Sequence, residues 1–112
     1  MADTFFGGRN VMYTGKSASL KMSKPLIENL ELDNNIFQCE IMQYDESGEK
    51  LLLRLKNNQI ERLSLSAIYD CQISLIDKEL LCKGIIKERY SDASGSIVSF
   101  AIETGIYEIN VK

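Results

Sequence analysis

Apolar and polar residues alternate with a period of two through most of the chain after Phe37, and turn residues interrupt the alternation at short intervals. Successive side chains of a strand point to opposite faces, so this pattern predicts half-buried strands joined by tight turns. It is clearest from Ala67 to Ile76, where a slip of one residue would expose the whole apolar set. Similar segments are residues 37–42, 51–56, 79–90, 98–104 and 107–111.

These segments predict an antiparallel meander of five to seven strands. A sheet with one apolar face must close on itself or pack on another sheet, and 112 residues fit a single domain. We therefore predict an all-β fold, a small antiparallel β-barrel or split barrel of about six strands, over residues 17–112. Gly84 is expected to mark a bulge or a sharp bend. Residues 23–32, which include Pro25, are expected to be extended rather than helical.

Residues 1–16 precede this pattern and carry three glycines without any periodicity. They predict an N-terminal tail, either flexible or docking. The apolar residues of this segment, among them Phe5, Phe6 and Tyr13, favour docking on the barrel or on a partner chain.

The composition excludes several kinds of chemistry. The chain has no histidine, which removes the commonest general base and metal ligand. The spacing of Cys39, Cys71 and Cys82 matches no zinc motif, and their strand patterns predict reduced, buried thiols. A phosphate loop fails because Asn10 stands where its first glycine is required. We expect no cofactor and no catalytic activity; an enzyme using Asp or Glu at a barrel mouth is the alternative.

No apolar stretch reaches the roughly 18 residues of a membrane span, and the first residues lack the pattern of a secretory signal. We expect a soluble, cytoplasmic protein that does not bind membranes. The net charge of −3 disfavours nonspecific binding to nucleic acid.

One stretch, KERYSDASGSIVSF at residues 87–100, offers a candidate polar site. Lys83, Lys87 and Arg89 alternate along one predicted strand, which would place their charges on one face. Together with Asp92 and Ser94 they could form an anion or nucleotide site. The simpler interpretation is a solvated strand face followed by a hairpin turn.

Three aromatic residues, Tyr69, Tyr90 and Phe100, could stack bases of single-stranded nucleic acid in an OB-like or Sm-like barrel. Each falls on the apolar face of its predicted strand, so the alternation favours a core position for all three. Nucleic-acid binding is therefore the weaker alternative.

Residues 63–109 resemble the PilZ family of small bacterial β-barrels, and in particular the split barrel that precedes the PilZ domain in flagellar-brake regulators. The resemblance lies in a strand with an inward aromatic residue, a strand ending in a basic stretch, a Gly/Ser turn and a β-rich end. It implies a regulatory module that binds cyclic di-GMP through RxxxR and [DN]xSxxG motifs. No two arginines of this chain stand four apart, and Ile97 replaces the glycine of the second motif.

These departures predict a PilZ-like barrel that lacks standard cyclic di-GMP binding. We expect a non-catalytic binding or regulatory module whose partner is another protein or a second copy of the chain, reached through the tail or an open strand edge. A cyclic dinucleotide remains an alternative ligand for the residue 83–94 patch.

Overall fold

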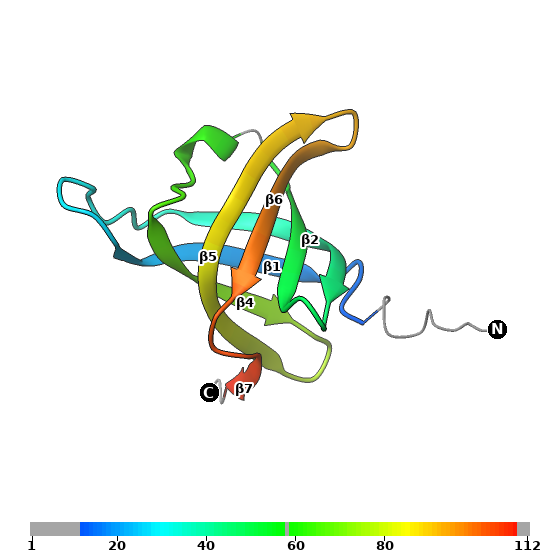
Figure 1. Ribbon diagram of the computed structural model, residues 1–112. Helices are drawn as coiled ribbons and strands as arrows, with labels where there is room; N and C mark the ends of the chain where they lie inside the picture. Colours follow the sequence, from blue (N-terminus) through cyan, green and yellow to red (C-terminus); the bar gives the residue numbers. More distant parts are fainter. Residues whose placement is uncertain (1–11, 58, 110–112) are drawn as a thin grey trace.

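The computed structural model describes residues 12–57 and 59–109. This part of the chain forms seven strands and one short 3₁₀ helix (Figure 1). The elements are β1 (Ser17–Pro25), β2 (Ile36–Asp45), β3 (Lys50–Leu55), η1 (Ile60–Arg62), β4 (Ala67–Ser74), β5 (Glu79–Asp92), β6 (Gly95–Ile102) and β7 (Tyr107–Ile109).

All strand pairings are antiparallel, in the order β4-β1-β2-β3-β6-β5, and a further pairing between β5 and β4 closes the ring. The short strand β7 adds to β5 outside this ring. The predicted small barrel of about six strands is confirmed. The first strand, β1, was not predicted as a strand. Of residues 23–32, which were expected to be extended, residues 23–25 are extended at the end of β1, whereas residues 26–32 belong to an irregular loop that continues to residue 35.

Strand β5 closes the barrel because it bends and pairs with two neighbouring strands. Its first half pairs with β4, its second half pairs with β6, and Gly84 lies at the overlap, opposite both Tyr69 and Ile102. A Cβ atom on Gly84 would stand 2.0 Å from the carbonyl oxygen of Ala101. Gly84 therefore allows a close approach of backbones at the bend, as predicted. The bulge in β5 lies further on, between Ile86 and Glu88.

The interior is filled by the apolar residues of the alternating strand patterns. Tyr69, Phe37 and Phe100 are the largest of its fully buried side chains. The Tyr69 hydroxyl accepts a hydrogen bond from the Ser64 amide at 2.9 Å, which ties the β3–β4 connection (residues 59–66) to the barrel. The three cysteines are free and buried, as predicted, and burial raises the pKa of Cys39 to about 12.

Part of the predicted tail docks on β2. The Gly15 amide donates to the Ile41 carbonyl at 2.8 Å, and the Ile41 amide donates to the Lys16 carbonyl at 2.9 Å. The Tyr13 and Tyr44 rings lie 5.3 Å apart. Residues 1–11 of the tail, with Phe5 and Phe6, lie outside the described residues.

The connections lie at two ends of the barrel. The β1–β2 loop (residues 26–35) and the β3–β4 connection lie at one end, where the Leu26 amide donates to the Ser66 carbonyl at 2.9 Å. In Figure 1 the β1–β2 loop projects from the left side of the barrel. The β2–β3 and β4–β5 hairpins lie at the far ends of β2 and β4, away from this loop.

Candidate functional site

The five residues of the predicted polar site do not come together. Lys83 lies on the outside of β5, where its Nζ contacts Asp70 Oδ1 at 2.5 Å and Ser23 Oγ at 3.4 Å. The hydrogen bond with Asp70 raises the pKa of Lys83, so the lysine stays charged and is paired within the sheet.

A β-bulge separates Lys83 from Arg89. Ile86 pairs with Phe100, but the next pairing joins Glu88 to Ser99, so Lys87 is the extra residue. A bulge of this kind shifts the alternation by one position, because two residues on the bulged strand oppose one on its partner. The predicted common face for Lys83, Lys87 and Arg89 is therefore wrong.

Beyond the bulge, Arg89 is opposite the buried Val98 and reaches the β3–β4 connection. Its Nη1 donates to the carbonyl of Ile60 at 3.1 Å and of Glu61 at 2.9 Å, and also to that of Leu63. These carbonyls belong to η1 and the residue after it. Arg89 therefore fixes this connection, whereas Lys87 is exposed at the bulge.

Asp92 and Ser94 build the β5–β6 hairpin. Asp92 Oδ1 accepts the Ser94 amide at 2.7 Å, and Gly95 takes a φ of 119° that side chains disfavour. The Ser94 carbonyl accepts a hydrogen bond from Arg54 at 3.3 Å. Lys83 and Asp92 are separated by a strand path of roughly 30 Å at the usual rise per residue. The stretch thus forms the hairpin that the simpler interpretation predicted.

The same bulge changes the position of one predicted aromatic core residue. Tyr69 and Phe100 are fully buried, as predicted, but Tyr90 is 42% exposed. Tyr90 pairs with Ile97, which is buried but lies outside the main core cluster. Because Tyr90 is the only one of these three rings that is exposed, the three residues do not form the base-stacking platform considered above.

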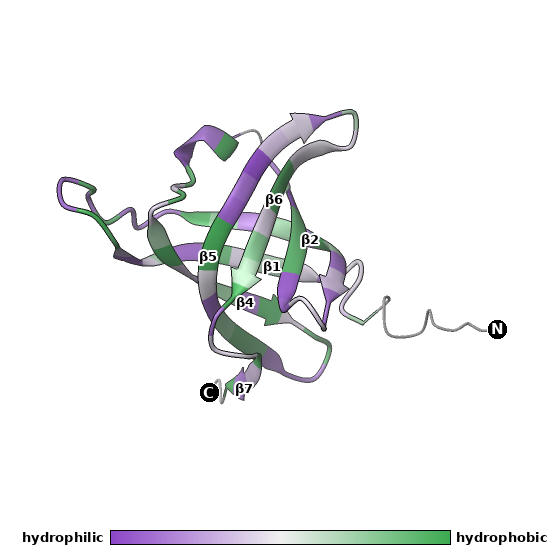
Figure 2. Cartoon of the chain, in the orientation of Figure 1, coloured by the Kyte–Doolittle hydropathy of each residue, from purple (hydrophilic) through white to green (hydrophobic). Residues whose placement is uncertain are grey.

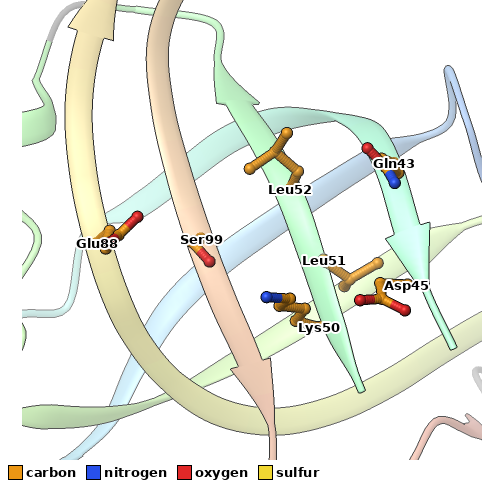
Figure 3. Close-up of a pocket in the computed structure, with 7 residues that line it drawn as sticks. All are labelled: Gln43, Asp45, Lys50, Leu51, Leu52, Glu88 and Ser99. Atoms are coloured by element: carbon orange, nitrogen blue, oxygen red, sulfur yellow. The ribbon is translucent and has the colours of Figure 1, made fainter. Parts of the chain in front are cut away.

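The outer faces of four strands share an open depression of about 360 Å³ (Figure 3). Four paired residues form its centre, one from each strand: Gln43, Leu52, Ser99 and Glu88. A bulge lies next to this row in β2, before Gln43, and another in β5, before Glu88. Bulges increase the local twist of a sheet, which accounts for the hollow.

The chemistry of this depression is limited. Asp45, on its edge, accepts hydrogen bonds from the Gly48 amide at 3.0 Å and from Ser47 Oγ at 3.1 Å. These hydrogen bonds lower the pKa of Asp45, and the bond from the Gly48 amide has the larger effect. A carboxyl group with a lowered pKa is a poor proton donor near neutral pH. Asp45 therefore serves its own hairpin and does not have the raised pKa of a general acid.

Other candidate sites give no further chemistry. Within residues 12–57 and 59–109, no group of three Cys, Asp or Glu residues is placed to hold a metal ion. The same part of the chain contains no helix long and apolar enough to cross a membrane.

A second surface was not predicted as a site. It consists of five exposed aliphatic side chains at one end of the barrel, which we call the apolar end. They are Leu26, Ile27 and Leu32 of the β1–β2 loop, Ile36 at the start of β2, and Leu65 of the β3–β4 connection. Apolar segments alternate with polar ones along the projecting loop in Figure 2.

The β1–β2 loop is held in place by the barrel. Leu30 packs against the core, and the Asp33 amide donates to Met22 Sδ at 3.5 Å. Asp33 Oδ1 accepts the backbone and side-chain nitrogens of Asn35 at 2.9 and 2.7 Å. The loop thus turns Leu30 inward while its other aliphatic residues stay exposed.

Comparison with known proteins adds no assignment to this geometry. No family model matches the chain, and no curated protein or solved structure shows significant similarity to it.

Proposed function

We propose that this chain is a non-catalytic binding or regulatory module, a PilZ-like barrel without standard cyclic di-GMP binding, that binds a protein partner at its apolar end. The observation that carries the proposal is the position of the exposed aliphatic residues. Of nine large exposed hydrophobic residues in the described part of the chain, five belong to the apolar end.

Single exposed apolar residues are normal on protein surfaces, whereas a group on adjoining segments is typical of an interaction site. The Leu26–Ser66 hydrogen bond joins the two segments, and Pro25 pairs with Ala67 beside it. The anchored loop also means that a partner would meet a surface that is already formed, which reduces the entropy cost of binding.

The contacts of Arg54 and Arg89 support the absence of standard nucleotide binding. Arg54 pairs with Glu40 at 2.9 Å and also holds the Ser94 carbonyl, while Arg89 holds the β3–β4 connection. Gripping a dinucleotide phosphate through either guanidinium would require breaking these contacts. A calorimetric titration with cyclic di-GMP is therefore expected to give no heat, and micromolar binding would contradict this part of the proposal.

The partner site can be tested with a photo-reactive amino acid placed at Ile27 in cells. A matched variant carries it at Ile76, which is 99% exposed on the β4–β5 hairpin, at the other end of the barrel. We expect a discrete adduct with another protein from position 27 and none from position 76. Equal adduct patterns at both positions, or adducts only between copies of the chain, would contradict a partner site at the apolar end.

A further inference from the structure

The β1–β2 loop carries acidic residues among its exposed aliphatic ones. Residues 26–35 contain Glu28, Glu31 and Asp33 and neither lysine nor arginine. Glu28 and Glu31 are exposed, and within the described part of the chain neither takes part in an ion pair or a side-chain hydrogen bond. Asp33 is engaged with Asn35. Two carboxylates therefore stand free beside Leu26, Ile27 and Leu32.

The neighbouring segments neutralise this charge only in part. Glu61 and Arg62 of η1 are both exposed and offset each other. Lys24 at the end of β1 and Lys21, which pairs with Ile36, are two exposed cations against the three acidic residues of the loop. The end of the barrel thus combines an aliphatic surface with a net acidic surround. We call Glu28 and Glu31 the free carboxylates of this surface.

This charge distinguishes between the candidate occupants. A symmetric pair of copies would bring the free carboxylates of both chains to one interface, and each chain carries a net charge of −3. An anionic lipid surface would be repelled for the same reason. A segment with aliphatic side chains and flanking lysines or arginines would satisfy both the apolar area and the carboxylates.

We infer that the apolar end binds a basic, aliphatic segment of a partner protein, with Glu28 and Glu31 selecting the basic flanks. The inference rests on the proposed function and adds the chemistry of the partner. Because both carboxylates are exposed, their contribution is selectivity and salt dependence rather than most of the affinity.

The test uses two synthetic amphipathic peptides that share their leucines and differ in carrying lysine or glutamate. Each is titrated into the isotope-labelled protein while amide resonances are followed. We expect the leucine–lysine peptide to shift the amides of residues 26–36 and 65–66, and the leucine–glutamate peptide to leave them unchanged. Added salt should weaken the binding.

The charge-reversal variant Glu28→Lys/Glu31→Lys should bind the leucine–lysine peptide about tenfold more weakly. Glu46→Lys/Glu49→Lys is the matched control, since it makes the same change of net charge on the β2–β3 hairpin at the opposite end. It should keep most of the affinity. Leu26→Ser/Ile27→Ser should lose binding while its circular dichroism spectrum stays that of the native barrel.

Other outcomes overturn the inference in separable ways. Equal binding of both peptides at residues 26–36, or equal weakening in the two charge-reversal variants, would refute charge selection and leave a docking surface. Shifts confined to other surfaces would refute the apolar end as a peptide site, whereas the cross-linking at Ile27 decides the proposed function by itself.

Light scattering that shows a dimer lost in Leu26→Ser/Ile27→Ser would identify a second copy as the occupant. Co-sedimentation of the protein with vesicles containing phosphatidylserine, lost in the same variant, would identify a lipid surface instead.

Discussion

The β5–β6 hairpin and the β1–β2 loop differ in which of their groups are free to meet a partner. The hairpin region is rich in charged and polar residues, yet Arg89, Asp92 and the Ser94 carbonyl all have partners within the chain. The loop has a less distinctive sequence, yet it exposes Leu26, Ile27 and two carboxylates.

The difference teaches that the composition of a connection does not reveal whether its side chains are available. A polar residue that satisfies a backbone carbonyl contributes to folding, and removing it leaves that carbonyl unpaired. An exposed leucine with solvent on most sides contributes little to folding, so its replacement alters the surface alone. Stability measurements can therefore separate the two regions.

The largest expected effect is at Gly84, the residue on which the path of β5 depends. In Gly84→Ala the new Cβ would meet the Ala101 carbonyl oxygen at 2.0 Å and the Phe100 ring at 2.9 Å. Both neighbours belong to β6 inside a closed barrel, so we expect a loss of about 3 kcal/mol or more in the free energy of unfolding. Urea denaturation followed by circular dichroism measures it.

The control for this prediction is Ile27→Ser in the β1–β2 loop, where Ile27 is 57% exposed. It should change the free energy of unfolding by about 0.5 kcal/mol or less. If the two variants lose similar stability, the conclusion that β5 is needed for folding while the exposed side chains of the β1–β2 loop are not is wrong.

The next effect is at Arg89, whose guanidinium holds the carbonyls of Ile60, Glu61 and Leu63. Hydrogen bonds from a charged donor contribute more than neutral ones, so Arg89→Ala should cost about 2 kcal/mol. The neighbouring Lys87→Ala, at the exposed bulge, should cost about 0.5 kcal/mol or less. If both variants lose equally little stability, Arg89 does not hold the β3–β4 connection and its guanidinium is available to bind a ligand.

The fold was largely predictable because the barrel is built on period-two alternation. From β2 to the bulge in β5, and again in β6 from Val98 onward, the inward positions are apolar or glycine, and each connection contains Gly, Asn, Asp or Ser residues, so each of these strands was recognised from local sequence. Strand β1 was missed because only Ala18, Leu20 and Met22 mark its inward face, among serines and lysines. The order of the strands depends on contacts between distant segments, which no local pattern records.

The polar site was not predictable in the same way. After Ile86 the residues up to Ser94 include no aliphatic side chain larger than alanine, so nothing in the sequence fixes which face each residue takes. The bulge at Lys87 therefore went unseen, and with it the positions of Arg89 and Tyr90. The apolar end had a signal that could have found it. Leu26, Ile27 and Leu32 share a segment with no strand or helix period, and such residues must be either anchored or exposed.

The smallest expected effect concerns Lys83, the one residue of the predicted site that takes part in an ion pair. Asp70 raises the pKa of Lys83 in the folded protein above the unfolded value of about 10.4. The pair therefore stabilises the fold at pH values below the unfolded pKa. This stability is lost as the pH rises through the folded pKa, because the neutral amine loses its attraction to Asp70. The Lys83 and Asp70 side chains are 39% and 34% exposed, so solvent screening keeps the effect to a few tenths of a kcal/mol, roughly.

Urea unfolding of the native chain and of Asp70→Asn, at about pH 8 and about pH 12, measures this contribution. Deprotonation of the unfolded chain's thiols also destabilises the fold at high pH, but it affects both proteins alike and cancels in the comparison. The native chain should be slightly more stable than Asp70→Asn at the lower pH, and the gap should close at the higher one. A gap that stays constant with pH would mean that the pair does not form, and that Lys83 is free on the surface of β5 as the exposed residues of the β1–β2 loop are.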